Sequence, residues 1–107
     1  MVITLPRLVA LDSARPRLEA KLEQEYEGHT AALTELMQRR RRRHTTDVEA
    51  AATDVRHALA DVAQALRRMA EGSYGTCEGC AGDIELERLE HQPTARYCRT
   101  CAPSSVA

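Results

Sequence analysis

Aromatic residues are scarce in this chain of 107 residues, which has three tyrosines, no phenylalanine and no tryptophan. Large aromatic side chains supply much of the apolar area of a globular core. A short chain that is poor in them is badly equipped to build a thick core. We therefore expect one domain, or a small domain with an extension, that is elongated, held together by a metal, or both.

Long apolar runs are also missing, because no stretch of the sequence approaches the roughly 20 residues needed to span a bilayer. Near the N-terminus, Arg7 and Asp12 interrupt the apolar stretch, and this does not fit a secretory signal peptide. The sequence therefore predicts a cytoplasmic protein without a membrane partner.

Catalytic motifs cannot be recognised either. The sequence has no Ser/His/Asp or Cys/His arrangement, no phosphate-binding loop and no isolated carboxylate pair. We therefore predict that the protein is not an enzyme.

Four cysteines stand in the last third of the chain as two C-x-x-C pairs separated by seventeen residues, Cys77 with Cys80 and Cys98 with Cys101. This spacing is typical of a zinc site, and four thiolates complete the tetrahedral shell of a structural zinc ion. A redox pair would need a βαβ context, and two disulfides would need an oxidising compartment. The turns of such a site need residues that tolerate unusual backbone angles. Three glycines accompany the first pair: Gly75, Gly79 and Gly82. We predict one structural Zn²⁺ held by the four cysteines.

Residues 48–69 carry an apolar repeat with alternating steps of four and three residues, which predicts a helix with an a/d seam over three heptads. Its members are Val48, Ala52, Val55, Leu59, Val62, Leu66 and Met69. We expect Thr46 and Glu49 to form a capping box that opens this helix and Gly72 to close it.

A second, less regular seam lies upstream, in a helix that we expect to begin at Asp12 or Ser13, with Pro16 tolerated in its first turn. Its members are Leu18, Leu22, Tyr26, His29, Leu33 and Leu36. A lone histidine at a core position more often sets the helix register than binds a ligand, and we interpret His29 in this way. Folding the chain near residue 44 pairs the two seams as an antiparallel hairpin about 40 Å long.

The sequence thus predicts an all-α protein, with a long antiparallel coiled-coil hairpin followed by a small four-cysteine zinc finger. We expect an N-terminal segment at 1–12, the hairpin at 13–72 with its tip near 40–47, the finger at 73–101 and a flexible tail at 102–107. We expect a monomer, and the alternative of an interaction module whose coiled coil pairs with another helix stays open.

A specific pattern of residues runs from the end of the second helix through the finger. It comprises Gly72, Tyr74, Gly75, Cys77, Cys80, Ile84, Arg88, Leu89, Glu90, Pro93, Ala95, Cys98 and Cys101. This pattern, directly after a long helical hairpin, resembles the DksA/TraR family of zinc-finger transcription regulators. The resemblance implies a protein that binds bacterial RNA polymerase and pushes its coiled coil into the secondary channel, through which nucleotides reach the active site. It also implies that initiation is altered without contact to promoter DNA.

The expected tip departs from the family pattern. Well-studied members carry an Asp-x-x-Asp-x-Ala motif there, whereas this chain has only Asp47 nearby and Ala50 in place of the second acid. We favour helix capping as the role of Asp47. Some members also bind guanosine tetraphosphate through basic residues, and here Asp61 and Gln92 stand at two such places. We therefore predict a weak or absent response to this alarmone.

Five consecutive arginines lie at the expected tip: Arg39, Arg40, Arg41, Arg42 and Arg43. Cations in the last turn of a helix interact favourably with its macrodipole, so one interpretation of the run is a solvated helix end. Five in a row exceed that need, and such a run often marks an interaction segment. We predict that these arginines, with Asp47, form the partner-binding tip. In the polymerase channel, guanidinium groups would meet carboxylates or phosphates. The alternative is a zinc protein that binds nucleic acid directly through the arginines, although residues 44–107 hold six basic and ten acidic groups.

Overall fold

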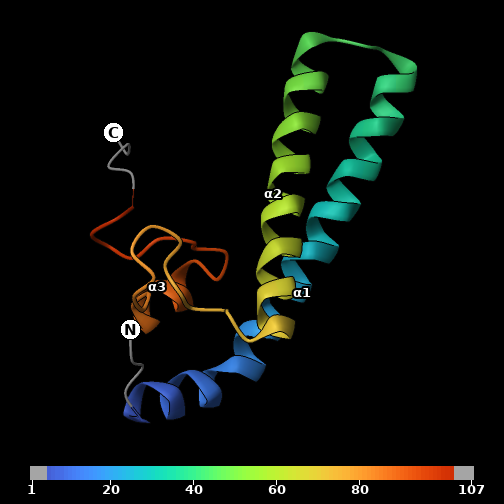
Figure 1. Ribbon diagram of the computed structural model, residues 1–107. Coiled ribbons are helices and arrows are strands. Elements are labelled where there is room, and N and C mark those ends of the chain that lie inside the picture. Colours follow the sequence, from blue (N-terminus) through green and yellow to red (C-terminus); the bar gives the residue numbers. More distant parts are fainter. Residues whose placement is uncertain (1–4, 103–107) are drawn as a thin grey trace.

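The computed structural model describes residues 5–102 and contains three helices, α1 (Leu5–Arg42), α2 (Thr46–Glu71) and α3 (Leu86–His91). The molecule is elongated, with principal extents of 55 × 30 × 20 Å. Figure 1 shows α1 and α2 as a long hairpin, with the finger beside its base. Between residues 5 and 102 there is no strand, only an isolated antiparallel bridge between Thr76 and Asp83. The predicted all-α hairpin with a small finger is confirmed.

The seam of α2 lies where the heptad pattern predicts it. All seven of its members are buried or half-buried, and Ala52, Val62 and Met69 are the most enclosed. On α1 the seam differs from the prediction at one position, because Tyr26 is 44% exposed while Glu25 is half-buried. The pattern of burial through Leu18, Leu22, Glu25 and His29 restores steps of four, three and four, which keep one face of a helix toward its partner. The assignment of Tyr26 to the seam was wrong because it followed hydrophobicity rather than spacing.

The two ends of α2 are capped by short-range contacts. The residue that caps its N-terminus is Thr45, whose hydroxyl accepts a hydrogen bond from the backbone N–H of Val48 over 3.1 Å. The predicted capping box at Thr46 is therefore wrong by one residue. At the other end Gly72 adopts the left-handed conformation, with φ of 83°, and so confirms the predicted stop.

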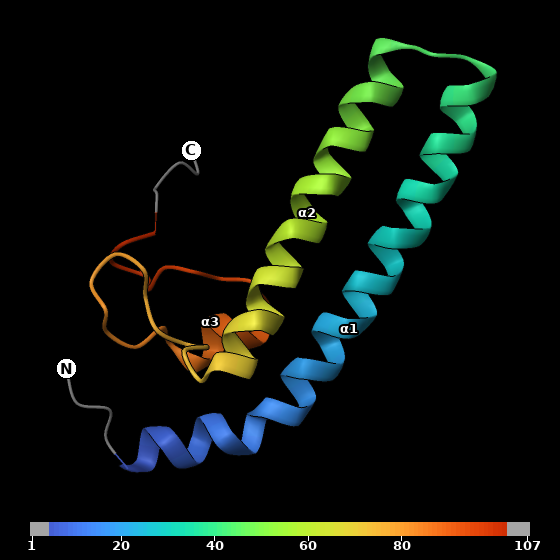
Figure 2. The same cartoon turned by 45° about the vertical axis from the view of Figure 1, so that its right-hand side comes forward.

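Helix α1 begins at Leu5, so the predicted start at Asp12 or Ser13 is wrong, and residues 5–12 are helical rather than a separate segment. Pro16 lies inside the helix. A proline ring removes one backbone donor and bends a helix where it sits. Figure 2 shows the N-terminal part of α1, in dark blue, turned away from the hairpin and passing below the finger.

This bent part of α1 reaches the finger. A terminal amino group of Arg7 donates to the carbonyl oxygen of Gly75 over 3.4 Å, and its Nε lies 3.9 Å from the carboxylate of Asp83. A proline-bearing helix can thus continue through its bend when contacts on the far side hold it.

One core joins the base of the hairpin to the finger. Leu18 and Leu22 of α1, Val62 of α2, and Ile84 and Leu89 of the finger are all at most 1% exposed and belong to a single cluster. The predicted flexible tail at 102–107 falls almost entirely outside the described residues. Among residues 5–102, no helix combines the length and the apolar character needed to cross a membrane.

Candidate metal centre and hairpin tip

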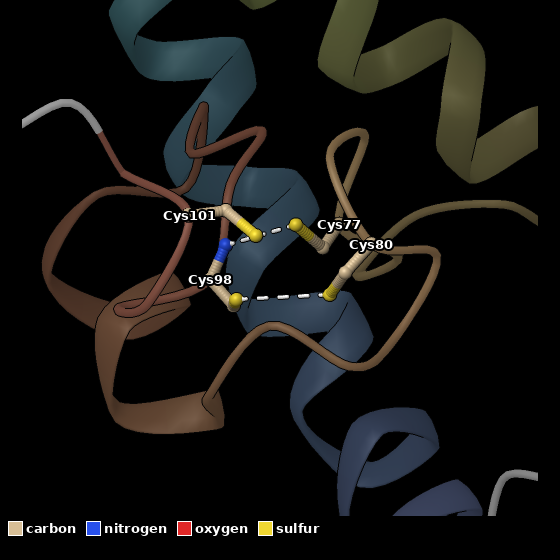
Figure 3. A group of neighbouring side chains, drawn as sticks. All are labelled: Cys77, Cys80, Cys98 and Cys101. Atoms are coloured by element: carbon tan, nitrogen blue, oxygen red, sulfur yellow. Dashed lines mark hydrogen bonds between the residues drawn. The ribbon is translucent and has the colours of Figure 1, made fainter.

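The four cysteines predicted as metal ligands converge on one point. Their sulfur atoms all lie within 4.8 Å of one another, and the sulfurs of Cys80 and Cys98 are 3.9 Å apart. Figure 3 shows the two pairs facing each other across the finger. Four sulfurs arranged tetrahedrally around zinc at about 2.3 Å stand about 3.8 Å apart, so the cluster fits the ion. A disulfide would need sulfurs about 2.05 Å apart, which this geometry excludes for Cys80 and Cys98.

Two tight turns hold the cysteines in place. In the first, the N–H of Ala81 donates to the carbonyl of Cys77 over 2.9 Å. In the second, the N–H of Cys101 donates to the carbonyl of Cys98 over 3.1 Å. The sulfur of Cys77 accepts backbone N–H groups from both turns, from Gly79 and from Cys98, each at 3.3 Å. The backbone is therefore arranged to stabilise a thiolate at Cys77.

The four cysteine thiols can all be ionised together only if a cation neutralises part of their charge. Backbone N–H groups, that of Cys98 first, lower the pKa of the Cys77 thiol to about 6. Contact with the Cys98 thiol, and then with those of Cys77 and Cys80, raises the pKa of Cys101 to about 12. Crowded sulfurs cannot all ionise on their own, whereas a zinc dication takes the place of the protons. The predicted cofactor, one structural Zn²⁺ on four thiolates, is confirmed by this donor set.

The glycines of the finger have different roles. A Cβ on Gly79 would lie 3.1 Å from the Cβ and 3.2 Å from the sulfur of Cys101, so a side chain there would force the two turns apart by a few tenths of an ångström. Gly75 adopts a positive φ of 89°, as expected. Gly82 does not, and the neighbouring Ala81 takes the left-handed conformation instead, with φ of 63°.

Side chains outside the cysteines fix the finger against the hairpin. The Arg68 guanidinium of α2 pairs with the Glu78 carboxylate inside the first turn, and Arg96 donates to the amide oxygen of Gln64 over 3.2 Å. Arg88 donates to the carbonyl of Tyr97 over 2.9 Å. No sequence signal predicts the contact between Arg68 and Glu78, because no periodic pattern relates a helix to the loop that follows it.

The tip lies at the end of the hairpin away from the finger, in the green segment of Figure 1. Two of its five arginines are paired, Arg39 with Glu35 at 3.2 Å and Arg40 with Glu49 at 2.9 Å. The carboxylate of Glu49 also lies 3.6 Å from the Nε2 of His44. The side chains of the other three form no hydrogen bond or ion pair with any residue from 5 to 102 and are exposed: Arg41, Arg42 and Arg43.

Of the other residues named from the sequence, one lies at the tip and two lie beside the finger. Asp47 is exposed in the first turn of α2, where a negative charge favours the helix dipole. Asp61 and Gln92 line one hollow beside the finger, together with Arg88 and Arg96. The cysteine cluster and the arginine run are thus two separate sites at opposite ends of the molecule.

The comparisons with known proteins agree with this architecture. Residues 72–106 match the model of the prokaryotic dksA/traR C4-type zinc finger. The fold is similar to the structure of transcription factor DksA2 from Pseudomonas aeruginosa, with 26% sequence identity and a TM-score of 0.55. The match covers 81% of this chain and 75% of that one. No curated protein matches the chain in sequence.

These findings define the class of protein. The chain carries a zinc finger of the dksA/traR C4 type in a fold similar to that of DksA2, and the resemblance read from the sequence is confirmed. They support a function of the transcription-factor kind.

Proposed function

We propose that the protein is a cytoplasmic, non-catalytic transcription regulator that binds bacterial RNA polymerase as a monomer. In this proposal the hairpin enters the secondary channel of the polymerase, and promoter DNA is not recognised. The observation that carries the proposal is the joining of a dksA/traR-type finger to a hairpin whose fold is similar to that of DksA2.

The shape of the hairpin supports the proposal. Helix α2 has 26 residues and is therefore about 39 Å long, and α1 lies along it over that distance. The core shared with the finger and the zinc site both lie at the base of the hairpin, away from its tip. A narrow rod anchored on a wider base can enter a channel that would exclude a globular domain.

The tip would be the part that meets the inside of the channel. We propose that Arg39–Arg43 and Asp47 form this contact, so that a basic surface stands where well-studied relatives present two acids. Guanidinium groups pair with carboxylates and phosphates, which are attracted to a cation rather than repelled. The regulatory effect would then differ from that of an acidic tip.

The hollow beside the finger bears on guanosine tetraphosphate. Asp61 contributes a carboxylate to its lining, and this opposes an anionic ligand, although Arg88 and Arg96 also line the hollow. The predicted weak or absent alarmone response stays a prediction.

Competition for the channel tests the proposal. Labelled, zinc-loaded protein is mixed with core RNA polymerase, with and without a transcript-cleavage factor that occupies the secondary channel. We expect binding that the competitor abolishes. Binding that survives the competitor would place the protein elsewhere on the enzyme, and no binding at modest salt would refute the proposal.

Direct nucleic-acid binding is separated by a second measurement. The measurement is an electrophoretic mobility shift of RNA or DNA. Direct nucleic-acid binding would be favoured by a strongly salt-dependent shift that is lost when Arg39–Arg43 are changed to glutamine. A variant with glutamine at Arg17, Arg67 and Arg99, near the base, controls for loss of positive charge in general.

A further inference from the structure

The five arginines of the tip are not equivalent. Arg39 and Arg40 are held by Glu35 and Glu49, whereas Arg41, Arg42 and Arg43 have no acidic partner among residues 5–102. Cations at a helix end need water or the dipole for stabilisation, and three adjacent ones also repel each other. An anion that binds them relieves this repulsion.

A hollow at the tip brings one of these three arginines, Arg41, together with Arg40 and His44. Its volume is about 360 Å³, and it is lined by Met37, Arg40, Arg41 and His44. Arg40 and Glu49 form an ion pair through the Nε of Arg40, without a hydrogen bond, and the terminal amino groups of that guanidinium form no hydrogen bond with any residue from 5 to 102, so they stay available for a ligand. The hollow therefore presents two guanidinium groups and an imidazole to one bound group.

The distribution of charge along the chain limits the size of the anion that the tip can bind. Residues 35–49 contain five arginines and three acidic residues, a surplus of two positive charges, whereas the rest of the chain carries a net charge of −3. Four thiolates and a zinc ion add two more negative charges at the base. A long polyanion would extend from the tip onto this negative surface, but a compact anion would not.

The arginine side chains of the tip favour phosphate groups over a single carboxylate as the bound anion. A carboxylate offers two oxygens, whereas a chain of phosphates offers several oxygens to guanidinium groups on different sides. The tip lacks phenylalanine, tyrosine and tryptophan, and Tyr26 is thirteen residues from Arg39 along α1, which is about 20 Å. Within residues 35–49 the imidazole of His44 is the one ring that could stack on a base, whereas single-stranded nucleic-acid sites stack successive bases on several aromatic side chains.

We propose that Arg41, Arg42 and Arg43, with the hollow beside Arg40 and His44, bind the triphosphate group of a nucleotide. The binding site follows from the tip alone. That the nucleotide is one entering the polymerase channel rests on the proposed function.

Titration of the full-length, zinc-loaded protein tests the site without polymerase. Sodium tripolyphosphate and then ATP are added, and the arginine Nε–Hε signals are followed by NMR, with affinities from calorimetry. We expect saturable binding of both, and weaker binding of orthophosphate at equal ionic strength. Replacing Arg41, Arg42 and Arg43 by glutamine should weaken binding by about tenfold or more, because several charge-assisted hydrogen bonds are lost.

The matched control removes the same charge at the base, through Arg17→Gln, Arg67→Gln and Arg99→Gln. Their side chains are exposed, and the ion pair of Arg17 with Glu90 is of the surface type that contributes little. We expect this variant to bind tripolyphosphate within about twofold of the natural chain. Equal weakening in both variants, or no saturation, would overturn the proposal.

Three further outcomes test the proposals separately. A short RNA that binds more tightly than ATP at the same salt would overturn the triphosphate assignment. Tripolyphosphate binding without polymerase binding would leave the site intact and refute the proposed function. Polymerase binding without tripolyphosphate binding would refute the triphosphate site and leave the proposed function standing.

Discussion

The Tyr74 hydroxyl donates a hydrogen bond to the backbone carbonyl oxygen of Pro93 over 2.8 Å. Tyr74 stands between the end of α2 and the first cysteine turn, and Pro93 precedes the second turn by five residues. Both residues are buried. The contact therefore ties together the two halves of the finger on the side that faces the hairpin.

Replacing Tyr74 by phenylalanine should destabilise the finger. The ring can stay in place, but the carbonyl of Pro93 loses its partner in a buried position, at a cost of about 1–2 kcal/mol. Urea denaturation of the zinc-loaded protein measures the change. The exposed Tyr26, changed in the same way, is the control and should alter the free energy of unfolding by less than about 0.5 kcal/mol. Equal effects at the two positions would contradict the role of the Tyr74 hydroxyl.

The same hydroxyl predicts an alkaline transition. Burial raises the pKa of Tyr74 to about 12 from its ordinary value near 10. Its stabilising contribution is therefore complete below pH 10 and is lost as the pH rises toward 12, because ionisation is easier in the unfolded chain. The loss corresponds to about 2–3 kcal/mol.

The Tyr74→Phe variant lacks this titration, so it isolates the contribution from those of other groups. The difference in free energy of unfolding between the two proteins should shrink and then reverse between pH 10 and pH 12. A difference that stays constant over this range would show that Tyr74 ionises as easily folded as unfolded.

Removing the metal should unfold the finger before the hairpin. Residues 73–101 depend on the four cysteines for their turns, whereas α1 and α2 pair along their own seam. We expect a chelator to abolish amide protection in the finger and to leave most of the helical circular dichroism. Protection should also fall near Leu18 and Leu22, which the finger covers. Amide protection in the finger that survives chelation would show that the metal is not what holds it.

The sequence was sufficient to predict the metal site and the hairpin, because the spacing of the cysteines specifies one and the spacing of apolar residues specifies the other. Two C-x-x-C pairs can close on one ion only if their sulfurs meet, and they do. The seam of α2 has an apolar residue at every a and d position, so its buried face follows directly. The seam of α1 has Glu25 at such a position, and choosing the apolar neighbour Tyr26 put the wrong residue in contact.

The start of α1 could not be read from local signals. Ser13 and Pro16 look like the opening of a helix. The helix nevertheless continues back to Leu5, because Arg7 and Leu11 contact Gly75 of the finger, 64 or more residues away. Contacts at that distance in sequence leave no periodic pattern. The pairing of Arg68 with Glu78 escaped prediction for the same reason.

A pair of glycine substitutions separates close packing from helix propensity. Gly79→Ala places a methyl group against the sulfur of Cys101, at 3.2 Å, and should displace a metal ligand. We expect weaker zinc binding, measured by competition with a chromophoric chelator. Gly28 is also glycine, but its Cβ position is open and lies inside α1, so Gly28→Ala should stabilise the helix by about 0.5–1 kcal/mol with zinc affinity unchanged. If Gly79→Ala bound zinc as tightly as Gly28→Ala, the contact with Cys101 would be unimportant.

Glu49 should limit anion binding at the tip. Its carboxylate lies 2.9 Å from the Nε of Arg40 and 3.6 Å from the Nε2 of His44, beside the hollow proposed for the triphosphate. Replacing Glu49 by glutamine removes a charge that repels phosphate and frees the whole Arg40 guanidinium. We expect the affinity for tripolyphosphate to rise severalfold. The pair of Arg40 with Glu49 is partly exposed, so its loss should cost less than about 1 kcal/mol of stability.

The matched control for this change is Glu35→Gln, which removes the same charge from the partner of Arg39, a residue that does not line the hollow. Calorimetry with tripolyphosphate at fixed ionic strength compares the two variants. A site at the hollow requires a clearly larger gain for Glu49→Gln than for Glu35→Gln, because only the former acts on a group that contacts the ligand. Equal gains would mean that the tip attracts anions only through its net charge.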